Sequence, residues 1–329
     1  MRVSWVYLCL DYLMVSNAIS NESIESSNAL VPSKYSVVKG FFEQDDSSTD
    51  NDDFDFMKDN FGLVSGTTWS DVTSEVDKLN AKNDNGTQYK LFFFARHGEG
   101  YHNIAPDNYS SEEWECVMQE QDGADGIEWY DALLTPDGIS ETSDLHTFWQ
   151  NQLSGGAPLP ESFYVSPLRR TLQTFNYTWN GLISYSDQIP LVVENAREKY
   201  GIGTESKRHP KSYISENYPF ANFEDGFTEN DKLWTTTKHE KSKHVRYRAE
   251  LVLDEIFTSD NNTVISVTTH SGTISAFLKI VDHRKWSMKT GEVIPVIIKA
   301  SKYEPYSKPD VDDAWSTLPS SCATYVADN

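Results

Sequence analysis

The feature that most constrains the fold of this chain is an apolar run that ends abruptly in two polar side chains. Residues 91–95 read Leu-Phe-Phe-Phe-Ala, and Arg96 and His97 follow them directly. An unbroken apolar run of this length is typical of a strand buried on both faces, and Gly98 and Gly100 allow a sharp turn after it. Ligands of open α/β sheets bind beyond the carboxyl ends of the strands. A cation and an imidazole at this position therefore indicate a binding crevice.

Two later segments repeat this arrangement. Residues 164–174 pass from an apolar strand into a helix with arginine at the junction, and residues 264–272 do the same with His270. A lone histidine at a strand end is usually an ordinary polar residue. Three strand ends that carry His, Arg and His can instead meet at one edge of a parallel sheet, so the pattern predicts a shared pocket.

These junctions resemble the three motifs of the histidine phosphatase (phosphoglycerate mutase-like) superfamily. The matching residues are Arg96-His97-Gly98-Glu99 with Asn103, Ser166-Pro167-Leu168-Arg169-Arg170 with Gln173-Thr174, and Thr269-His270-Ser271-Gly272. The resemblance covers residues 89–300 and is strongest to the mutase branch, in particular to fungal phosphomutase-like and acid phosphatase proteins. The alternation of strands and helices also predicts a three-layer α/β/α sandwich with a mainly parallel central sheet.

The resemblance implies phosphoryl transfer through a covalent intermediate on His97. Arg96 and Arg170 would hold the phosphoryl oxygens, and a protonated His270 would stabilise the charge that is transferred. Only one of the two adjacent arginines can point into the site, and the family's register selects Arg170, which leaves Arg169 on the helix surface. No metal or other cofactor is expected, because the cations are side chains.

The acid that protonates the leaving group is predicted to be Glu198, which lies in the family's Arg-Glu-x-x-Gly context, with Glu194 as the alternative. Asn103 and Glu99 match family positions beside the phosphate, where they would bind it or fix the loop. His102 is interpreted as an ordinary polar loop residue.

The same side chains serve phosphatases and mutases. We expect hydrolysis of a small phosphomonoester in the acid range. The alternatives are a phosphoglycerate mutase-like phosphomutase and, from another class, a phospho-ligand binding module without catalysis. The formal charge of −22, from 28 basic and 50 acidic residues, argues against nucleic acid or an anionic membrane as a partner. The charge balance does not predict the oligomeric state.

The N-terminal residues 1–20 combine Arg2, an apolar run and small residues near position 18, which predicts a signal peptide. Asn-x-Ser/Thr sequons, among them those at Asn21, Asn85, Asn108 and Asn176, are compatible with a secreted glycoprotein. We therefore expect a secreted, cell-wall or periplasmic location, with the cytoplasm as the alternative. Removal of the leader leaves Cys116 and Cys322, which can form one disulfide.

The remaining segments are assigned by composition. Residues 21–88 are read as an acidic leader, loose over 21–60, followed by a packing helix that starts near Trp69. Residues 203–240 are read as an irregular insertion into the 89–300 domain that forms a lid or faces the substrate, with a surface excursion without function as the alternative. Residues 301–329 are read as an extended tail. Further elements are predicted as strands at 162–166, 189–193, 264–268 and 293–298 and helices at 110–121, 168–180 and 240–257, with a helix capped by Thr135 and a Gly-rich loop at 122–131.

Overall fold

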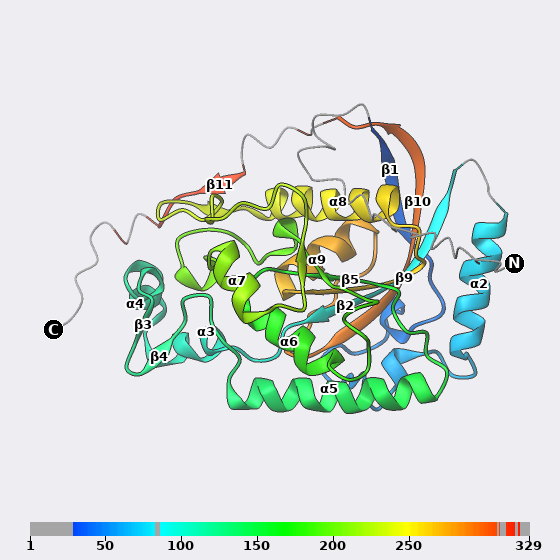
Figure 1. Cartoon of the computed structure of the whole chain (residues 1–329), viewed down its shortest axis with the longest axis horizontal. Helices are drawn as coiled ribbons and strands as arrows, with labels where there is room; N and C mark the ends of the chain where they lie inside the picture. Colours follow the sequence, from blue (N-terminus) through cyan, green and yellow to red (C-terminus); the bar gives the residue numbers. More distant parts are fainter. Residues whose placement is uncertain (1–28, 83–85, 308, 310–313, 320–321, 323–329) are drawn as a thin grey trace, which may run out of the picture.

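The computed structural model describes residues 29–82, 86–307, 309, 314–319 and 322, and these form a three-layer α/β/α sandwich (Figure 1). In this part of the chain the central sheet has the strand order β1-β10-β2-β9-β5-β6-β7. The strands are β1 (Leu30–Val37), β2 (Gln88–Arg96), β5 (Ser162–Val165), β6 (Leu191–Val192), β7 (Asn222–Phe223), β9 (Val264–Thr269) and β10 (Val293–Pro305). Neighbours from β2 to β7 are parallel, whereas β10 and β1 extend the other edge antiparallel. The predicted sandwich with a mainly parallel sheet is therefore confirmed.

Helices cover both faces of the sheet. Helices α8 and α9 pack together on one face, and α5 and α6 pack together on the other (Figure 1). The longer helices are α2 (Trp69–Ala81), α5 (Pro136–Ser154), α6 (Arg169–Trp179), α8 (Ser242–Ser259) and α9 (Ser271–Ile280), and the shorter ones are α3 (Tyr101–Ile104), α4 (Ser111–Cys116) and α7 (Lys211–Asn217). Two small ribbons lie outside the main sheet, formed by β3 (Gly123–Ala124) with β4 (Ile127–Glu128) and by β8 (His239–Glu240) with β11 (Trp315–Ser316).

Aromatic residues of β2 explain why the strand has no polar face. Successive side chains of a strand point to opposite faces. The Phe94 ring stacks on Phe277 of α9 with centroids 4.8 Å apart, whereas the Phe93 ring meets Trp149 of α5 edge-on at 4.9 Å. Both layers of helices thus pack on the one strand that ends at Arg96, which fixes the position of that strand end.

The N-terminal segment differs from the loose leader that its composition predicts. From Leu30 to Val37 the chain is strand β1, which pairs antiparallel with β10. Beyond it, aromatic rings that alternate with acidic residues are buried in the main core, at Phe42, Phe54, Phe56 and Phe61. The acidic side chains between these rings are mostly exposed. The acidic composition therefore suggested a loose segment, although its aromatic residues belong to the core.

The C-terminal tail and the insertion are also more ordered than predicted. Strand β10 continues to Pro305, past the expected end of the domain, because β1 pairs with its extension. The insertion 203–240 contains helix α7, and its strand β7 joins the edge of the main sheet beside β6. Most of the insertion therefore belongs to the body of the protein.

Helix starts follow the sequence closely. Thr68 caps α2 in a reciprocal capping box with Asp71, and the Thr135 hydroxyl accepts a hydrogen bond from the Gly138 N–H at the start of α5. The predicted helix 110–121 is shorter, since α4 ends at Cys116 and a 3-10 turn follows. The Gly-rich loop 122–131 contains the β3–β4 hairpin.

Several predictions fall outside the described residues. The signal peptide at residues 1–20 and the sequons at Asn21 and Asn85 belong to this group. Among the helices of the described residues, none combines the length and the apolar character needed to cross a membrane.

Candidate active site

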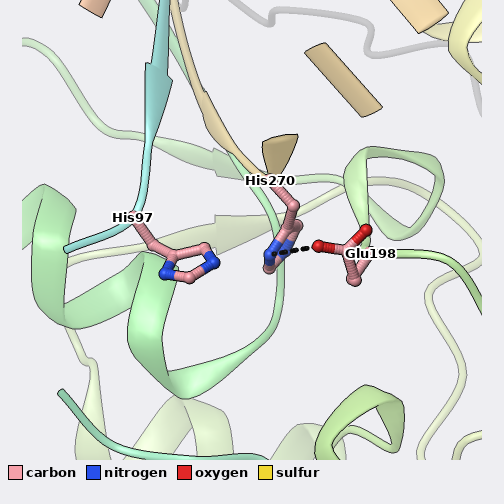
Figure 2. Close-up of side chains that lie close together, drawn as sticks. All are labelled: His97, Glu198 and His270. Carbon is pink, nitrogen blue, oxygen red and sulfur yellow. Dashed lines mark ion pairs between the residues drawn. The ribbon is translucent and has the colours of Figure 1, made fainter. Parts of the chain in front are cut away.

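Strand pairing brings the two motif histidines together. The parallel register of β2 and β9 places Arg96 opposite Thr269. His97 follows Arg96 and His270 follows Thr269, so the two histidines leave the sheet side by side. The backbone N–H of His97 donates to the Thr269 carbonyl at 3.1 Å. The two imidazole rings lie with centroids 5.1 Å apart, and both point toward the same space (Figure 2).

The tautomer of His97 is set by its own loop. Its Nδ1 lies 2.7 Å from the carbonyl oxygen of Gly98. A carbonyl only accepts hydrogen bonds, so Nδ1 must carry the proton, and Nε2 of the neutral ring keeps a free lone pair. Burial, together with the charges of Arg170 and Arg96, lowers the pKa of His97 well below its usual range. The ring is therefore neutral near pH 7, with a nucleophilic nitrogen.

Two guanidinium groups beside His97 have donors without partners. Arg96 donates Nη1 to the Met288 carbonyl at 2.7 Å, and Arg170 donates Nη1 to the Glu205 carbonyl at 2.8 Å. The Nε atom of Arg96 and the Nε and Nη2 atoms of Arg170 are buried with no hydrogen-bond partner. Buried donors without partners are costly. Anchored arginines with spare N–H groups next to a nucleophile fit an anion such as a phosphoryl group.

The loop after β2 is fixed by the side chains that the motif supplies. Asn103 accepts the Gly100 N–H through Oδ1 at 2.9 Å, and Glu99 accepts the Thr135 hydroxyl at 2.7 Å. Both residues therefore fix the loop. An ionised carboxylate is only an acceptor, so of the two only Asn103 can offer a donor to an anion. The structure thus supports loop fixing, rather than phosphate binding, for Glu99.

Close approach of the loop to α5 depends on glycine. A Cβ atom on Gly98 would lie 2.6 Å from the carbonyl oxygen of Gly138, and one on Gly138 would lie 2.0 Å from the Glu99 carbonyl oxygen. The two glycines allow the loop after β2 to pack directly on the first turn of α5.

Glu198 lies at the mouth of the same space. Its Oε2 is 3.7 Å from Nδ1 of His270, and the carboxylate side chain is 24% exposed whereas His270 is fully buried (Figure 2). The Nε2 atom of His270 lies 2.8 Å from the Ser166 hydroxyl oxygen, which orients the ring. The carboxylate can thus reach both the interior of the site and solvent.

Residues 194–198, which we name the acid loop, are held by hydrogen bonds to their carbonyl groups. Arg248 of α8 donates to the carbonyls of Asn195, Arg197 and Glu198. The hydroxyl of Thr269 donates to the Ala196 carbonyl, and Thr273 donates to that of Arg197. Strand β9, helix α9 and helix α8 thus jointly position Glu198.

Glu194, the alternative acid, lies in a different environment. Its carboxylate pairs with Arg197 at 2.6 Å and with Arg208 at 2.9 Å, and both guanidinium groups are fully buried. These ion pairs hold the acid loop against the insertion. Of the two candidates, Glu198 is the one that lies beside the histidines.

Arg169 is not on the helix surface, contrary to the prediction. Only 6% of the residue is exposed, and the guanidinium group donates to the carbonyls of Asp131 and Tyr130 and pairs with Glu128. The adjacent arginines therefore have different roles: Arg169 anchors residues 128–131, and Arg170 lies at the site. His209 lies with the first of these groups, with Nδ1 2.7 Å from the Asp131 carboxylate.

The charge state of His270 also differs from the prediction. Burial and the charges of Arg170, His97, His102 and Arg248 lower the pKa of His270 well below its usual range. Without an anion, the ring is therefore neutral at pH 7, not protonated. A negatively charged ligand, together with the Glu198 carboxylate 3.7 Å away, would offset the surrounding positive charge and favour the protonated form.

Sequence reasoning missed two groups at the site. The ring of His102 lies 5.2 Å from that of His97, although we interpreted it as an ordinary loop residue. Glu205 supplies the carbonyl that orients Arg170, and burial raises the pKa of its carboxyl group to about 7. The only signal for His102 was its position just before Asn103 in the first motif; Glu205 lies in an insertion whose path the sequence did not reveal.

The same side chains provide a possible set of metal ligands. One atom each from His97, Glu198 and His270 lies within 4.8 Å of the others. Two imidazoles and a carboxylate suit zinc or iron. Arg96 and Arg170, however, lower the pKa of His97, which means that they disfavour a further positive charge at that ring. The charge around the site therefore favours an anion over a divalent cation.

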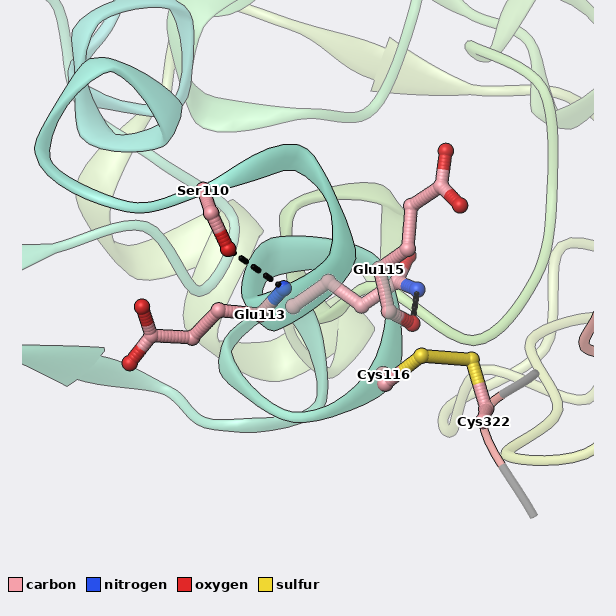
Figure 3. The surroundings of a disulfide bond; sticks show 6 residues. Ser110, Glu113, Glu115, Cys116 and Cys322 are labelled. Carbon is pink, nitrogen blue, oxygen red and sulfur yellow. Dashed lines mark hydrogen bonds between the residues drawn. A yellow bond between two sulfur atoms is a disulfide. The ribbon is translucent and has the colours of Figure 1, made fainter. Parts of the chain in front are cut away.

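The C-terminal tail is fastened close to the supports of the acid loop. Cys116, at the end of α4, forms a disulfide with Cys322 (Figure 3). Upstream in the tail, β11 pairs with β8, which contains Glu240. The Glu240 carboxylate in turn accepts from Nε of Arg248 at 2.8 Å. The cysteine pairing that the sequence allowed is thus present, and the tail lies against the elements that position Glu198.

Known proteins resemble this chain over most of its length. The sequence profile described as "Histidine phosphatase superfamily (branch 1)" matches residues 92–292. "Phosphomutase-like protein 3" of Candida albicans is 44% identical over 88% of this chain and 87% of its own length. "Probable phosphoglycerate mutase" of Arthroderma benhamiae is 35% identical over 82% of this chain and 86% of its own length.

Among solved structures, the alpha-ribazole phosphatase from Shigella flexneri covers 62% of this chain and 89% of its own, with a TM-score of 0.39 and 14% identity. The profile match spans all three strand-end motifs, and the similarity to the fungal proteins extends over most of the chain. The chain therefore belongs to the histidine phosphatase superfamily.

Proposed function

We propose that this protein is a phosphomonoesterase that acts in the acid range through a phosphohistidine intermediate on His97. The observation that carries the proposal is the combination of a neutral His97, with Nε2 free, and buried guanidinium donors that have no partner. A nucleophile next to buried donors that suit an anion is what covalent phosphoryl transfer requires.

In the first step, Nε2 of His97 attacks phosphorus in line with the ester oxygen. The N–P bond forms while the P–O ester bond breaks, and Glu198 gives its proton to the departing oxygen. Arg96 and Arg170 hold the non-bridging oxygens, and His270, which gains a proton when the dianion binds, adds a third donor.

In the second step, water hydrolyses the phosphohistidine. Glu198, now ionised, takes a proton from a water molecule, whose oxygen attacks phosphorus while the N–P bond breaks. Inorganic phosphate leaves, and both His97 and Glu198 return to their starting states. The partial exposure of Glu198 supports this step, since water can reach the carboxylate from outside.

A phosphoglycerate mutase-like activity is the second candidate, and the names of the fungal relatives favour it. A mutase must protect its phosphohistidine from water. The acid of this site is 24% exposed, which supports hydrolysis over protected transfer.

The test is hydrolysis of an aryl phosphate by the purified protein in the presence of a metal chelator. We expect turnover by the wild type and none by His97→Ala. His146→Asn, in which the altered side chain lies on α5 and bonds the Thr178 carbonyl, serves as the matched control. Activity in His97→Ala, or a requirement for a divalent ion, would contradict the mechanism. Turnover of 3-phosphoglycerate with a bisphosphate primer, at a rate above that of hydrolysis, would favour the mutase.

We also propose that the protein is secreted, on the strength of the apolar segment in residues 1–20 and the sequons. Peptide mapping of the mature N-terminus tests this. A mature chain that begins beyond position 18 supports secretion, and retention of Met1 contradicts it.

A further inference from the structure

His102 is a third imidazole at the site, and the mechanism above does not use it. Its ring lies 5.2 Å from His97, and Nδ1 is buried without a hydrogen-bond partner. The side chain as a whole keeps some exposure, unlike His97 and His270. The ring therefore borders the opening of the site, with one edge buried.

The loop is shaped to place this ring. A Cβ atom on Gly100 would lie 2.7 Å from Nδ1 of His102 and 2.9 Å from Cε1. Any other residue at position 100 would displace the imidazole. Because the Nδ1 edge lies against Gly100, Nε2 is the nitrogen that remains for a ligand.

The charged groups around His102 are those proposed to bind the phosphoryl group. Burial and then the charges of Arg170, His97 and Arg96 lower the pKa of His102 well below its usual range. His102 in turn contributes to the lowered pKa of His270, which follows β9. The groups that act on the ring thus come from α6, from the end of β2 and from the end of β9. The groups that lower the pKa of His102 are all positive or neutral, so a bound anion would offset them.

We propose that His102 is a further phosphate-binding residue, which contacts a non-bridging oxygen of the phosphoryl group through Nε2 once that group is bound. The inference rests on the proposed function and deepens it. A phosphoryl dianion between Arg96 and Arg170 offsets their charge. His102 then takes one proton from solvent and donates it in a hydrogen bond, and it returns the proton when inorganic phosphate leaves.

The experiment measures binding of orthovanadate, a phosphate analogue, to the full-length protein. His102→Phe keeps a ring beside His97 without a nitrogen, and His102→Asn keeps a polar group that cannot be protonated. Loss of a hydrogen bond to a charged group predicts an inhibition constant weaker by about 10- to 100-fold in both variants. The thermal midpoint should stay close to the wild-type value. His146→Asn is the control and should bind orthovanadate as the wild type does.

A second measurement follows the titration of the His102 imidazole in the wild-type protein, and a His102 variant serves only to assign its signal. In protein labelled with ¹⁵N-histidine, the His102 imidazole should titrate at a higher pH with orthovanadate bound than without it, by at least about one pH unit. A smaller shift would mean that the His102 ring does not take up a proton when the anion binds.

The two proposals fail in different ways. If both His102 variants bind orthovanadate within about twofold of the wild type, or if the His102 titration does not respond to it, the role of His102 is wrong, while an inactive His97→Ala still supports the proposed function. If His97→Ala remains active, the proposed function itself is wrong.

Discussion

The Nδ1 atom of His270 lies 3.7 Å from Oε2 of Glu198, while the other nitrogen of the same ring lies 2.8 Å from the Ser166 hydroxyl. The imidazole is thus oriented by Ser166 on one side and faces the carboxylate on the other. In the proposed mechanism, the longer contact leaves the Glu198 carboxylate able to give a proton to the leaving group. The contact with His270 distinguishes Glu198 from Glu194, the other carboxylate of the acid loop, which pairs with arginines instead.

Substitution of Glu198 should affect chemistry, whereas substitution of Glu194 should affect stability. We expect Glu198→Gln to lower kcat by about 10²- to 10⁴-fold for an alkyl phosphate, because the poor leaving group needs a proton. The loss should be smaller for p-nitrophenyl phosphate, whose leaving group is stable as an anion. Steady-state kinetics with both substrates measures the difference.

Glu194→Gln is the matched comparison. It removes the carboxylate that pairs with the buried Arg197 and Arg208, so we expect a lower midpoint of urea unfolding. If Glu194→Gln instead shows the leaving-group dependence and Glu198→Gln does not, the assignment of the acid is reversed.

The strand-end residues could be predicted from sequence because each follows a local pattern. Apolar runs end at Arg96 and Thr269, and the register of parallel strands brings the following histidines together. The caps at Thr68 and Thr135 were equally local signals. Glu198 required the resemblance to a family, since its surroundings alone do not distinguish it from Glu194.

What could not be predicted depends on contacts between distant segments. Arg169 is buried because residues 128–131 supply carbonyl and carboxylate partners. The sequence around Arg169 does not indicate these partners. Phe42 and Phe61 belong to the core, but their spacing matches neither a helix nor a strand. Strand β1 pairs with the extension of β10, which is a contact between segments far apart in the sequence.

The pH dependence of kcat/KM should reflect the lowered pKa of His97. The neutral ring is the nucleophile, so activity rises with pH as His97 loses its proton. Burial and the charges of Arg170 and Arg96 lower that pKa, which places the acidic limb below pH 6.5, the usual value. Arg170→Gln should move this limb to higher pH as well as weaken phosphate binding. A wild-type limb at or above pH 6.5 would contradict the assigned environment.

Glu240 should make stability depend on pH in the acid range. Burial alone would raise its pKa, but the ion pair with Arg248 and hydrogen bonds from His244 and the Tyr200 N–H lower the pKa to about 2 from 4.5. The carboxylate therefore stabilises the fold fully above pH 4.5, and this contribution is lost as pH falls toward 2. The shift corresponds to roughly 3 kcal/mol.

Glu240→Gln should remove this contribution, so urea unfolding at pH 7 should show a loss of roughly 3 kcal/mol. The difference from the wild type should shrink as the pH is lowered below 4.5. An unchanged difference across this range would mean that the Glu240 carboxylate is not the cause.

The disulfide between Cys116 and Cys322 closes a sequence separation of 206 residues. Closing a long loop restricts the unfolded chain, so its removal should lower stability by about 2 to 5 kcal/mol. A Cys116→Ser, Cys322→Ser double variant should therefore unfold at a lower temperature, and a reductant should shift the wild type toward the same midpoint. Equal midpoints with and without reductant would show that the bridge adds no stability.

Trapping of the covalent intermediate tests the central claim most directly. Enzyme mixed with a phosphomonoester and stopped within milliseconds by alkaline denaturation, which preserves phosphohistidine, is digested and mapped by mass spectrometry. The account predicts a phosphoryl group on His97 that appears faster than the steady-state rate and is absent from His97→Ala. Turnover with no phosphoenzyme, or a phosphoryl group on His270 or His102 instead, would contradict it.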